Sequence, residues 1–140
     1  MPDPSPDRWW RRLDEFGRAV DLFKRTDAIR RDRPLTEAKE GGLVQFFELS
    51  VELGWKTMAA YLRSQEVDVR VPSPLNVVRE AMRLGLIYDG DLWGDAVEGR
   101  NRMAHTYDPD AFRALIADVA ERFLPAMKRF RAGMEAIAAS

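Results

Sequence analysis

Apolar residues recur along this chain at spacings of three and four, the period of helices that bury one face. One such segment runs from residue 8 to about residue 29, and a second runs from residue 43 to about residue 64. Charged residues fill the other positions, so we expect two long amphipathic helices. Their apolar stripes are Trp9, Leu13, Phe16, Val20 and Phe23 in the first, and Val44, Phe47, Val51, Trp55, Met58 and Leu62 in the second.

Residues that cap helices, or that cannot continue them, divide the rest of the chain. Gly85 suits the position just after a helix, where a left-handed backbone is common. No segment shows the alternation typical of a strand. The sequence therefore predicts an all-α fold, an antiparallel four-helix up-and-down bundle with an additional short helix. The expected helix starts are at Thr36, at Ser73-Pro74, at Asp89 or Asp91, and at Asp108-Pro109.

The length of 140 residues fits one domain. Prolines alternate with polar residues over residues 1–7, so we expect a disordered tail there and a single helical domain over residues 8–140. This tail does not resemble a signal peptide. The chain contains no run of about 18 apolar residues, so we expect no membrane segment and a cytoplasmic location.

Composition limits the chemistry that the chain can perform. The absence of cysteine excludes disulfides, thiolate metal sites and a cysteine nucleophile, and the single histidine excludes a histidine-rich metal site within one chain. We therefore expect neither a metal nor a cofactor. The net charge of −1 argues against a strongly basic surface for nucleic acid, so any positive patch must be local.

The single histidine lies in a dense polar segment, residues 98–109, together with arginines, an asparagine and a tyrosine. Asn101 and His105 are four residues apart and therefore share a helix face. Arg100 and His105 are five residues apart, which places them about 140° apart around an ideal helix. These two side chains converge on one small target only if Arg100 reaches round or the helix loosens near His105.

An imidazole beside a guanidinium suits phosphodiester chemistry, because histidine can move a proton while arginine holds phosphate oxygens. Metal-free RNA cleavage needs both a base and an acid, and His105 supplies one group at a time. This interpretation therefore requires a symmetric dimer whose axis lies near His105. Spacing alone favours a simpler interpretation, in which His105 is a partial helix cap and Tyr107 packs on the surface. Arg100 and Arg102 would then pair with Glu98 or Asp95.

The predicted second helix carries a polar stripe that includes Glu48, Glu52 and Lys56. We favour a solvated face, with Glu52 and Lys56 as an i,i+4 ion pair. The functional alternative places Glu48 or Glu52 beside the cleft, where it orients Arg100 or His105.

Aromatic and basic residues elsewhere are expected to have structural roles. The aromatic positions favour the core or a dimer interface over base stacking. They are Phe47, Trp55, Trp93 and Phe112. The last helix is locally basic, which is typical of a solvated face, although such a face could guide RNA or an acidic partner. Its basic residues are Arg122, Lys128, Arg129 and Arg131.

The residues around His105 resemble a known signature. The pattern Arg100-Asn101-x-x-x-His105-x-Tyr107 is similar to the Arg-x4-His-x-Tyr signature of the HEPN superfamily of all-helical proteins. Residues 47–57 resemble the second-helix motif of one branch, the nucleotidyltransferase substrate-binding proteins. The resemblance extends from about residue 8 to about residue 130. Further motifs that match in order are Ser73-Pro74, Arg79-Glu80-Ala81, Gly85-Leu86-Ile87, Asp91-x-Trp93 and His105-Thr106-Tyr107-Asp108.

The resemblance implies a homodimer that places the Arg-x4-His residues of both protomers in one cleft. Many members are metal-independent endoribonucleases that act as toxins, and their usual partner is a minimal nucleotidyltransferase that acts as the antitoxin. Carried over by position, Arg100 and His105 would be catalytic, and Asn101 would support them. The partner can adenylylate the tyrosine two residues after the histidine, which is Tyr107 in this chain.

The resemblance leads to a preferred hypothesis, a HEPN-type toxin that cleaves RNA through Arg100 and His105. The alternative is a non-catalytic subunit that binds a nucleotide or substrate for a nucleotidyltransferase, as the name of the branch suggests. A structural dimer with a decayed site is a third possibility. The sequence departs from the commonest family pattern at Gly41-Gly42 and Gly54, where larger residues are usual. This departure concerns local helix packing more than the site.

Overall fold

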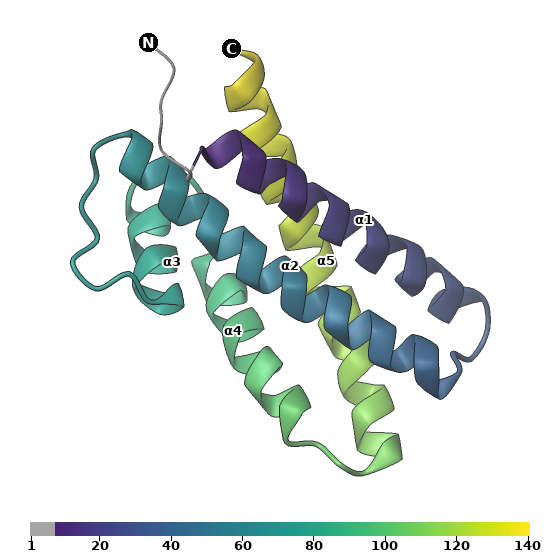
Figure 1. Cartoon of the computed structure of the whole chain (residues 1–140). Coiled ribbons are helices and arrows are strands. Elements are labelled where there is room, and N and C mark those ends of the chain that lie inside the picture. The colour runs from purple at the N-terminus through teal and green to yellow at the C-terminus, as the bar shows by residue number, and fades with distance from the viewer. Residues whose placement is uncertain (1–7) are drawn as a thin grey trace.

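The computed structural model describes residues 8–140, apart from the side chains of Asn101 and Ala104. The expected tail, residues 1–7, lies outside the described residues. The described chain folds into helices and contains no strand, so the all-α prediction is confirmed. The helices are α1 (Trp9–Asp32), α2 (Glu37–Ser64), α3 (Pro74–Arg83), α4 (Gly90–Ala104) and α5 (Pro109–Ala139) (Figure 1).

The helices form a bundle in which α2 contacts every other helix. Helices α1 and α2 lie side by side and antiparallel, and α5 packs behind them (Figure 1). Helix α4 packs against α2 and α5, while the short α3 packs against α2 and α4 at the opposite side from α1. The connection between α4 and α5 lies at the bottom of this view, away from α1. Four longer helices and one short helix are therefore arranged as the sequence predicts.

Polar caps fix most of the helix starts where the sequence predicts them. Thr36 accepts a hydrogen bond from the backbone of Lys39, and Ser73 accepts one from Asn76, both at 3.3 Å. The Asp108 carboxylate accepts the Ala111 N–H at 2.9 Å. Asp89 occupies the N-cap position of α4 but makes no side-chain cap.

The Asp89 carboxylate instead binds Arg129 of α5 at 2.8 Å. The expected capping bond at this helix start is therefore replaced by an ion pair between helices. Gly85 follows α3 with a φ of 76°, and the next N–H, that of Leu86, bonds back to the Ala81 carbonyl at 2.9 Å. This left-handed turn is the helix end that the glycine predicts.

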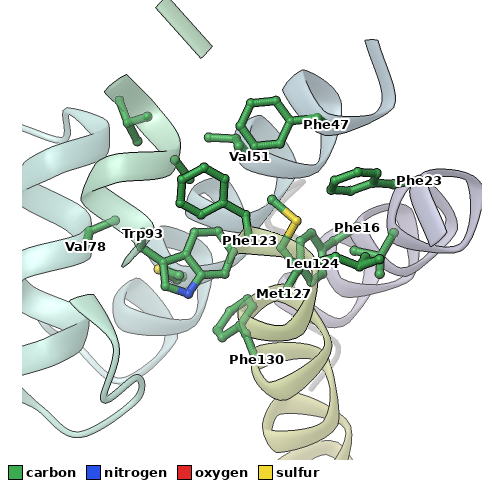
Figure 2. Close-up of a cluster of buried hydrophobic side chains, with 14 of the residues drawn as sticks. Phe16, Phe23, Phe47, Val51, Val78, Trp93, Phe123, Leu124, Met127 and Phe130 are labelled. Atoms are coloured by element: carbon green, nitrogen blue, oxygen red, sulfur yellow. The ribbon is translucent and has the colours of Figure 1, made fainter. Parts of the chain in front are cut away.

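Aromatic side chains from four helices fill the core (Figure 2). Phe47 of α2 stacks on Phe123 of α5, with ring centres 5.7 Å apart. Trp93 of α4 is 1% exposed and contacts the rings of Phe16 and Phe130 edge-on or tilted. The predicted core positions Phe47 and Trp93 are confirmed, whereas Trp55 and Phe112 are only partly buried.

Gly54 explains how α2 and α4 come close together. A Cβ placed on this residue would lie 2.7 Å from the Trp93 ring and 3.1 Å from the Phe16 ring. Glycine therefore makes room for the tryptophan. Gly41 and Gly42 lie inside α2 without such a contact, since a Cβ on Gly41 would meet no atom within 4 Å. None of the described helices has the length and hydropathy of a membrane-spanning segment.

Candidate active site

Helix α4 ends just before the single histidine. Its last residue is Ala104, and His105 adopts a non-helical backbone with φ of −114° and ψ of 8°. The His105 N–H donates to the Arg102 carbonyl at 3.1 Å, and the Thr106 hydroxyl donates to the same oxygen at 2.7 Å. The helix therefore loosens at His105. Such loosening is one of the two ways in which the His105 and Arg100 side chains can converge on one target.

The Arg100 side chain is anchored to α2. Its Nη1 donates to Oε2 of Glu52 at 2.9 Å, across 48 residues of sequence. Trp55 Nε1 donates to the same oxygen at 3.1 Å, and the Lys56 ammonium lies 3.0 Å from Oε1. Glu52 thus joins Arg100 on α4 to two residues of its own helix.

The charge of Glu52 is stabilised by these contacts. Burial by itself raises the pKa of this carboxyl group. Hydrogen bonds from Lys56, Trp55 and Arg100, together with the charge of Lys56, outweigh burial and lower the pKa below its ordinary value. The carboxylate is therefore ionised at neutral pH and holds both cations.

His105 and Tyr107 are exposed on the connection between α4 and α5. The Tyr107 side chain is 86% exposed. Within the described part of the chain, neither side chain forms a hydrogen bond or ion pair with another side chain. The structure therefore brings Arg100 and Glu52 together and leaves His105 and Tyr107 open to solvent.

Arg100 does not form the surface pairs that its sequence neighbours allow. Asp95 binds Arg122 of α5 at 2.6 Å, and Glu98 is exposed without an ion pair to the described residues. Arg102 is also exposed. The pairing of Arg100 with Asp95 or Glu98 is therefore wrong, and the partner of Arg100 is Glu52.

The sequence also names Glu48 and Asn101 as supporting residues. Glu48 lies one turn before Glu52 and is half-buried, but it forms no hydrogen bond or ion pair with another described side chain. The side chain of Asn101 lies outside the described residues. The polar role of Trp55 is not among the sequence predictions, which place this residue in the core or an interface. The spacing of three between Glu52 and Trp55 on one helix face is the signal that could have revealed this bond.

The basic residues of α5 lie on a solvated face, as predicted, and the structure shows in addition that the arginines among them are ion-paired, while Lys128 pairs with no described residue. Arg129 binds Asp89, and Arg131 binds Asp21 at 2.7 Å. Arg122 binds Asp95 and lies 3.8 Å from Asp118. The described residues contain no group of three or more side chains arranged to hold a metal ion.

Comparison with known proteins places this geometry in a family. Residues 11–136 match the family described as "Nucleotidyltransferase substrate binding protein like". The chain belongs to this family. Membership confirms the resemblance to the nucleotidyltransferase substrate-binding branch of the HEPN superfamily.

The chain is also similar to a protein named "Probable ribonuclease HepT" from Haemophilus influenzae (strain ATCC 51907 / DSM 11121 / KW20 / Rd). The two sequences are 33% identical over 81 residues, and the match spans 56% of this chain and 56% of that protein. The chain therefore aligns with about half the length of this curated relative.

Proposed function

We propose that the chain is a HEPN-type toxin, a metal-independent endoribonuclease that acts through Arg100 and His105 at the cleft of a homodimer. The observation that carries the proposal is the Glu52-anchored Arg100 guanidinium, five residues before an exposed His105 that has just left its helix. The family match and the name of the Haemophilus relative support this proposal.

In the proposed reaction the RNA 2′-hydroxyl oxygen attacks the adjacent phosphorus, and the bond from phosphorus to the 5′ oxygen breaks. A base takes the proton of the 2′-hydroxyl, and an acid gives a proton to the departing 5′ oxygen. His105 of one protomer is the base and His105 of its partner is the acid, since each chain has one histidine. Arg100 binds the non-bridging phosphate oxygens. The products are a cyclic phosphate and a 5′-hydroxyl.

We further propose that a partner minimal nucleotidyltransferase neutralises the toxin by adenylylating Tyr107. The Tyr107 hydroxyl oxygen would attack the α-phosphorus of ATP, pyrophosphate would leave, and the hydroxyl proton would be lost. The 86% exposure of Tyr107 supports this role, because a second protein must reach the acceptor. The added phosphate lies two residues from His105, where its negative charge would repel RNA.

Two arginines of the same helix turn provide the test of the nuclease. RNA is incubated with the purified chain and a chelator, and cleavage by Arg100→Ala is compared with cleavage by Arg102→Ala. We expect Arg100→Ala to reduce the rate by roughly a hundredfold or more. Arg102 is exposed and makes no ion pair within the described structure, so Arg102→Ala is the matched control. Equal rates for both variants would contradict the assignment of Arg100.

Two exposed tyrosines provide the test of modification. Tyr107 is 86% exposed and Tyr88, before α4, is 85% exposed, so accessibility does not distinguish them. After co-expression with the nucleotidyltransferase, we expect the added mass of one adenylyl group (AMP minus water) on wild type and on Tyr88→Phe, but not on Tyr107→Phe. A mass increase that survives Tyr107→Phe removes Tyr107 as the acceptor.

A second candidate function is a non-catalytic subunit that presents a nucleotide or substrate to the nucleotidyltransferase. The description of the matched family favours it. Expression without the nucleotidyltransferase separates the two functions, because a nuclease should arrest growth and a presenting subunit should not. Growth arrest that disappears with His105→Ala supports the nuclease, whereas normal growth with the wild-type chain supports the subunit.

A further inference from the structure

We propose that Lys56 is a second phosphate-binding residue of the site, which holds the RNA backbone together with Arg100. This inference rests on the proposed function and names a residue that the Arg-x4-His-x-Tyr signature does not contain. It departs from the expectation that Lys56 only forms a surface ion pair within α2.

Lys56 and Arg100 share the carboxylate of Glu52. The Lys56 ammonium lies 3.0 Å from Oε1 of Glu52, and the Arg100 guanidinium lies 2.9 Å from Oε2. One carboxylate group therefore brings a lysine of α2 and an arginine of α4 next to each other. An anion that approaches Arg100 from solvent also approaches Lys56.

Lys56 is held in place by its neighbours and remains accessible. Its ammonium lies over the Trp55 ring, 6.0 Å from the ring centre, and Trp55 also donates to Glu52. The side chain still keeps 40% of its surface exposed, so a ligand can reach it. The other three lysines are exposed and form no ion pair with a described residue. These three are Lys24, Lys39 and Lys128.

The cluster of Glu52, Lys56 and Arg100 keeps an unbalanced positive charge and unused N–H donors. Glu52 neutralises one of the two cations, so the three side chains together keep one positive charge. A guanidinium has five N–H donors and an ammonium has three, and each uses one of them on Glu52. A phosphodiester, with one negative charge and two non-bridging oxygens, matches this remaining positive charge and the remaining N–H donors. Such a contact recognises the backbone and carries no base preference.

The test measures RNA binding by a variant that does not cleave RNA. A single-stranded RNA oligonucleotide is titrated into the His105→Ala protein at a series of salt concentrations. The same titration is made with His105→Ala proteins that also carry Lys56→Gln, Lys56→Arg or Lys39→Gln. Lys39 lies on the same helix and is exposed, so Lys39→Gln is the matched control. Thermal unfolding of each protein checks that it is folded.

We expect Lys56→Gln to weaken binding by roughly tenfold, the loss of one charge-assisted hydrogen bond. The slope of log K against log salt should decrease in magnitude by about 0.7, the value for one phosphate contact on a single strand. Lys56→Arg should restore most of the affinity and the slope, which a merely structural role would not do. Lys39→Gln should follow the parent curve.

Two contrary results have different meanings. If the Lys56→Gln and Lys39→Gln curves coincide while the wild-type chain cleaves RNA, the inference about Lys56 is wrong and the proposed nuclease stands. If the His105→Ala chain does not bind RNA and the wild-type chain does not cleave it, both the inference and the proposed function are wrong.

Discussion

The two ends of helix α4 serve different purposes. Near its start, Trp93 is 1% exposed and fills the core between α1, α2 and α5. At its far end, Arg100 keeps 26% of its side chain exposed, and His105 lies in solvent beyond the last turn. Trp93 packs the first end into the core, whereas at the second end the Arg100 side chain is held by Glu52 while Met103 of the same turn stays buried.

This contrast separates stability from chemistry along a single helix. Buried aromatic contacts account for much of a fold's stability, so changes at the Trp93 end should alter unfolding strongly. Exposed polar groups contribute little to unfolding, but they can meet a substrate. Substitutions in α4 and α2 near Trp93 should therefore mainly reduce stability. Substitutions near Arg100 should mainly reduce activity.

Truncation of Trp93 should have the largest effect on stability. Trp93→Ala removes a buried ring that touches Phe16 and Phe130, and it leaves a cavity. We expect a loss of about 3–5 kcal/mol in the free energy of unfolding, measured by urea denaturation. A loss below about 1 kcal/mol would show that the start of α4 does not depend on this packing.

Substitution of Gly54, which faces the Trp93 ring, should have the next largest effect on stability. Gly54→Ala places a methyl group 2.7 Å from the Trp93 ring, so either the ring or the helix must move. We expect a loss of about 1–3 kcal/mol by urea denaturation. The double variant Gly54→Ala/Trp93→Phe should lose less than the sum of its single variants, because the smaller ring leaves room. Additive losses would contradict a direct contact.

Removal of the Glu52 charge should have a small effect on stability and a larger one on activity. Glu52→Gln should cost no more than about 1 kcal/mol at neutral pH, since the side chain is about one-third exposed. RNA cleavage should decrease by roughly tenfold or more, because Arg100 loses its anchor. Glu98→Gln, an exposed change on α4, is the control. Equal cleavage by the two variants would contradict a positioning role for Glu52.

The stability difference between wild type and Glu52→Gln should also depend on pH. The pKa of Glu52 is lower in the folded chain than its ordinary value. The contribution is therefore complete above the ordinary carboxyl range and is lost as the pH falls through the folded pKa. Urea denaturation at pH 7 and at progressively lower pH should show the two proteins converge in acid. A difference that grows in acid would contradict the direction of the shift.

One small predicted effect on stability has the opposite sign. Gly41 lies inside α2, and a methyl group added there would meet no atom within 4 Å, so Gly41→Ala should stabilise the protein by about 0.5–1 kcal/mol. Urea denaturation of Gly41→Ala and Gly54→Ala in parallel tests whether these two glycines of α2 have different roles. A loss of stability in Gly41→Ala would contradict the expectation that a methyl group at this position meets no neighbouring atom.

The sequence predicts the helices better than it predicts how they meet. Ser73-Pro74 and Asp108-Pro109 act locally, so their caps lie where expected. Arg100 and Glu52 are 48 residues apart, and their pairing depends on how α4 and α2 align, which periodicity cannot set. Asp89 illustrates the same limit, because a distant arginine, Arg129, competes for its carboxylate.

Asp27 is a different case, because it is buried although its ion-pair partners lie on its own helix. It continues the apolar stripe four residues after Phe23, and the structure buries it to 3% exposure. Arg30 and Arg31 donate to its two carboxylate oxygens at 2.8 and 3.0 Å. Its position on the stripe signals burial, but the arginines that permit burial follow on its own helix and look like surface charges in the sequence.

The most direct test of the account is His105→Ala, with RNA cleavage in chelator and the free energy of unfolding measured on the same protein. His105 is exposed beyond the end of α4, so unfolding should change by less than about 0.5 kcal/mol. The cleavage rate should decrease by roughly 10²–10⁴, the range for loss of a general acid or base. Undiminished cleavage by His105→Ala would contradict the claim that this end of α4 is the catalytic site.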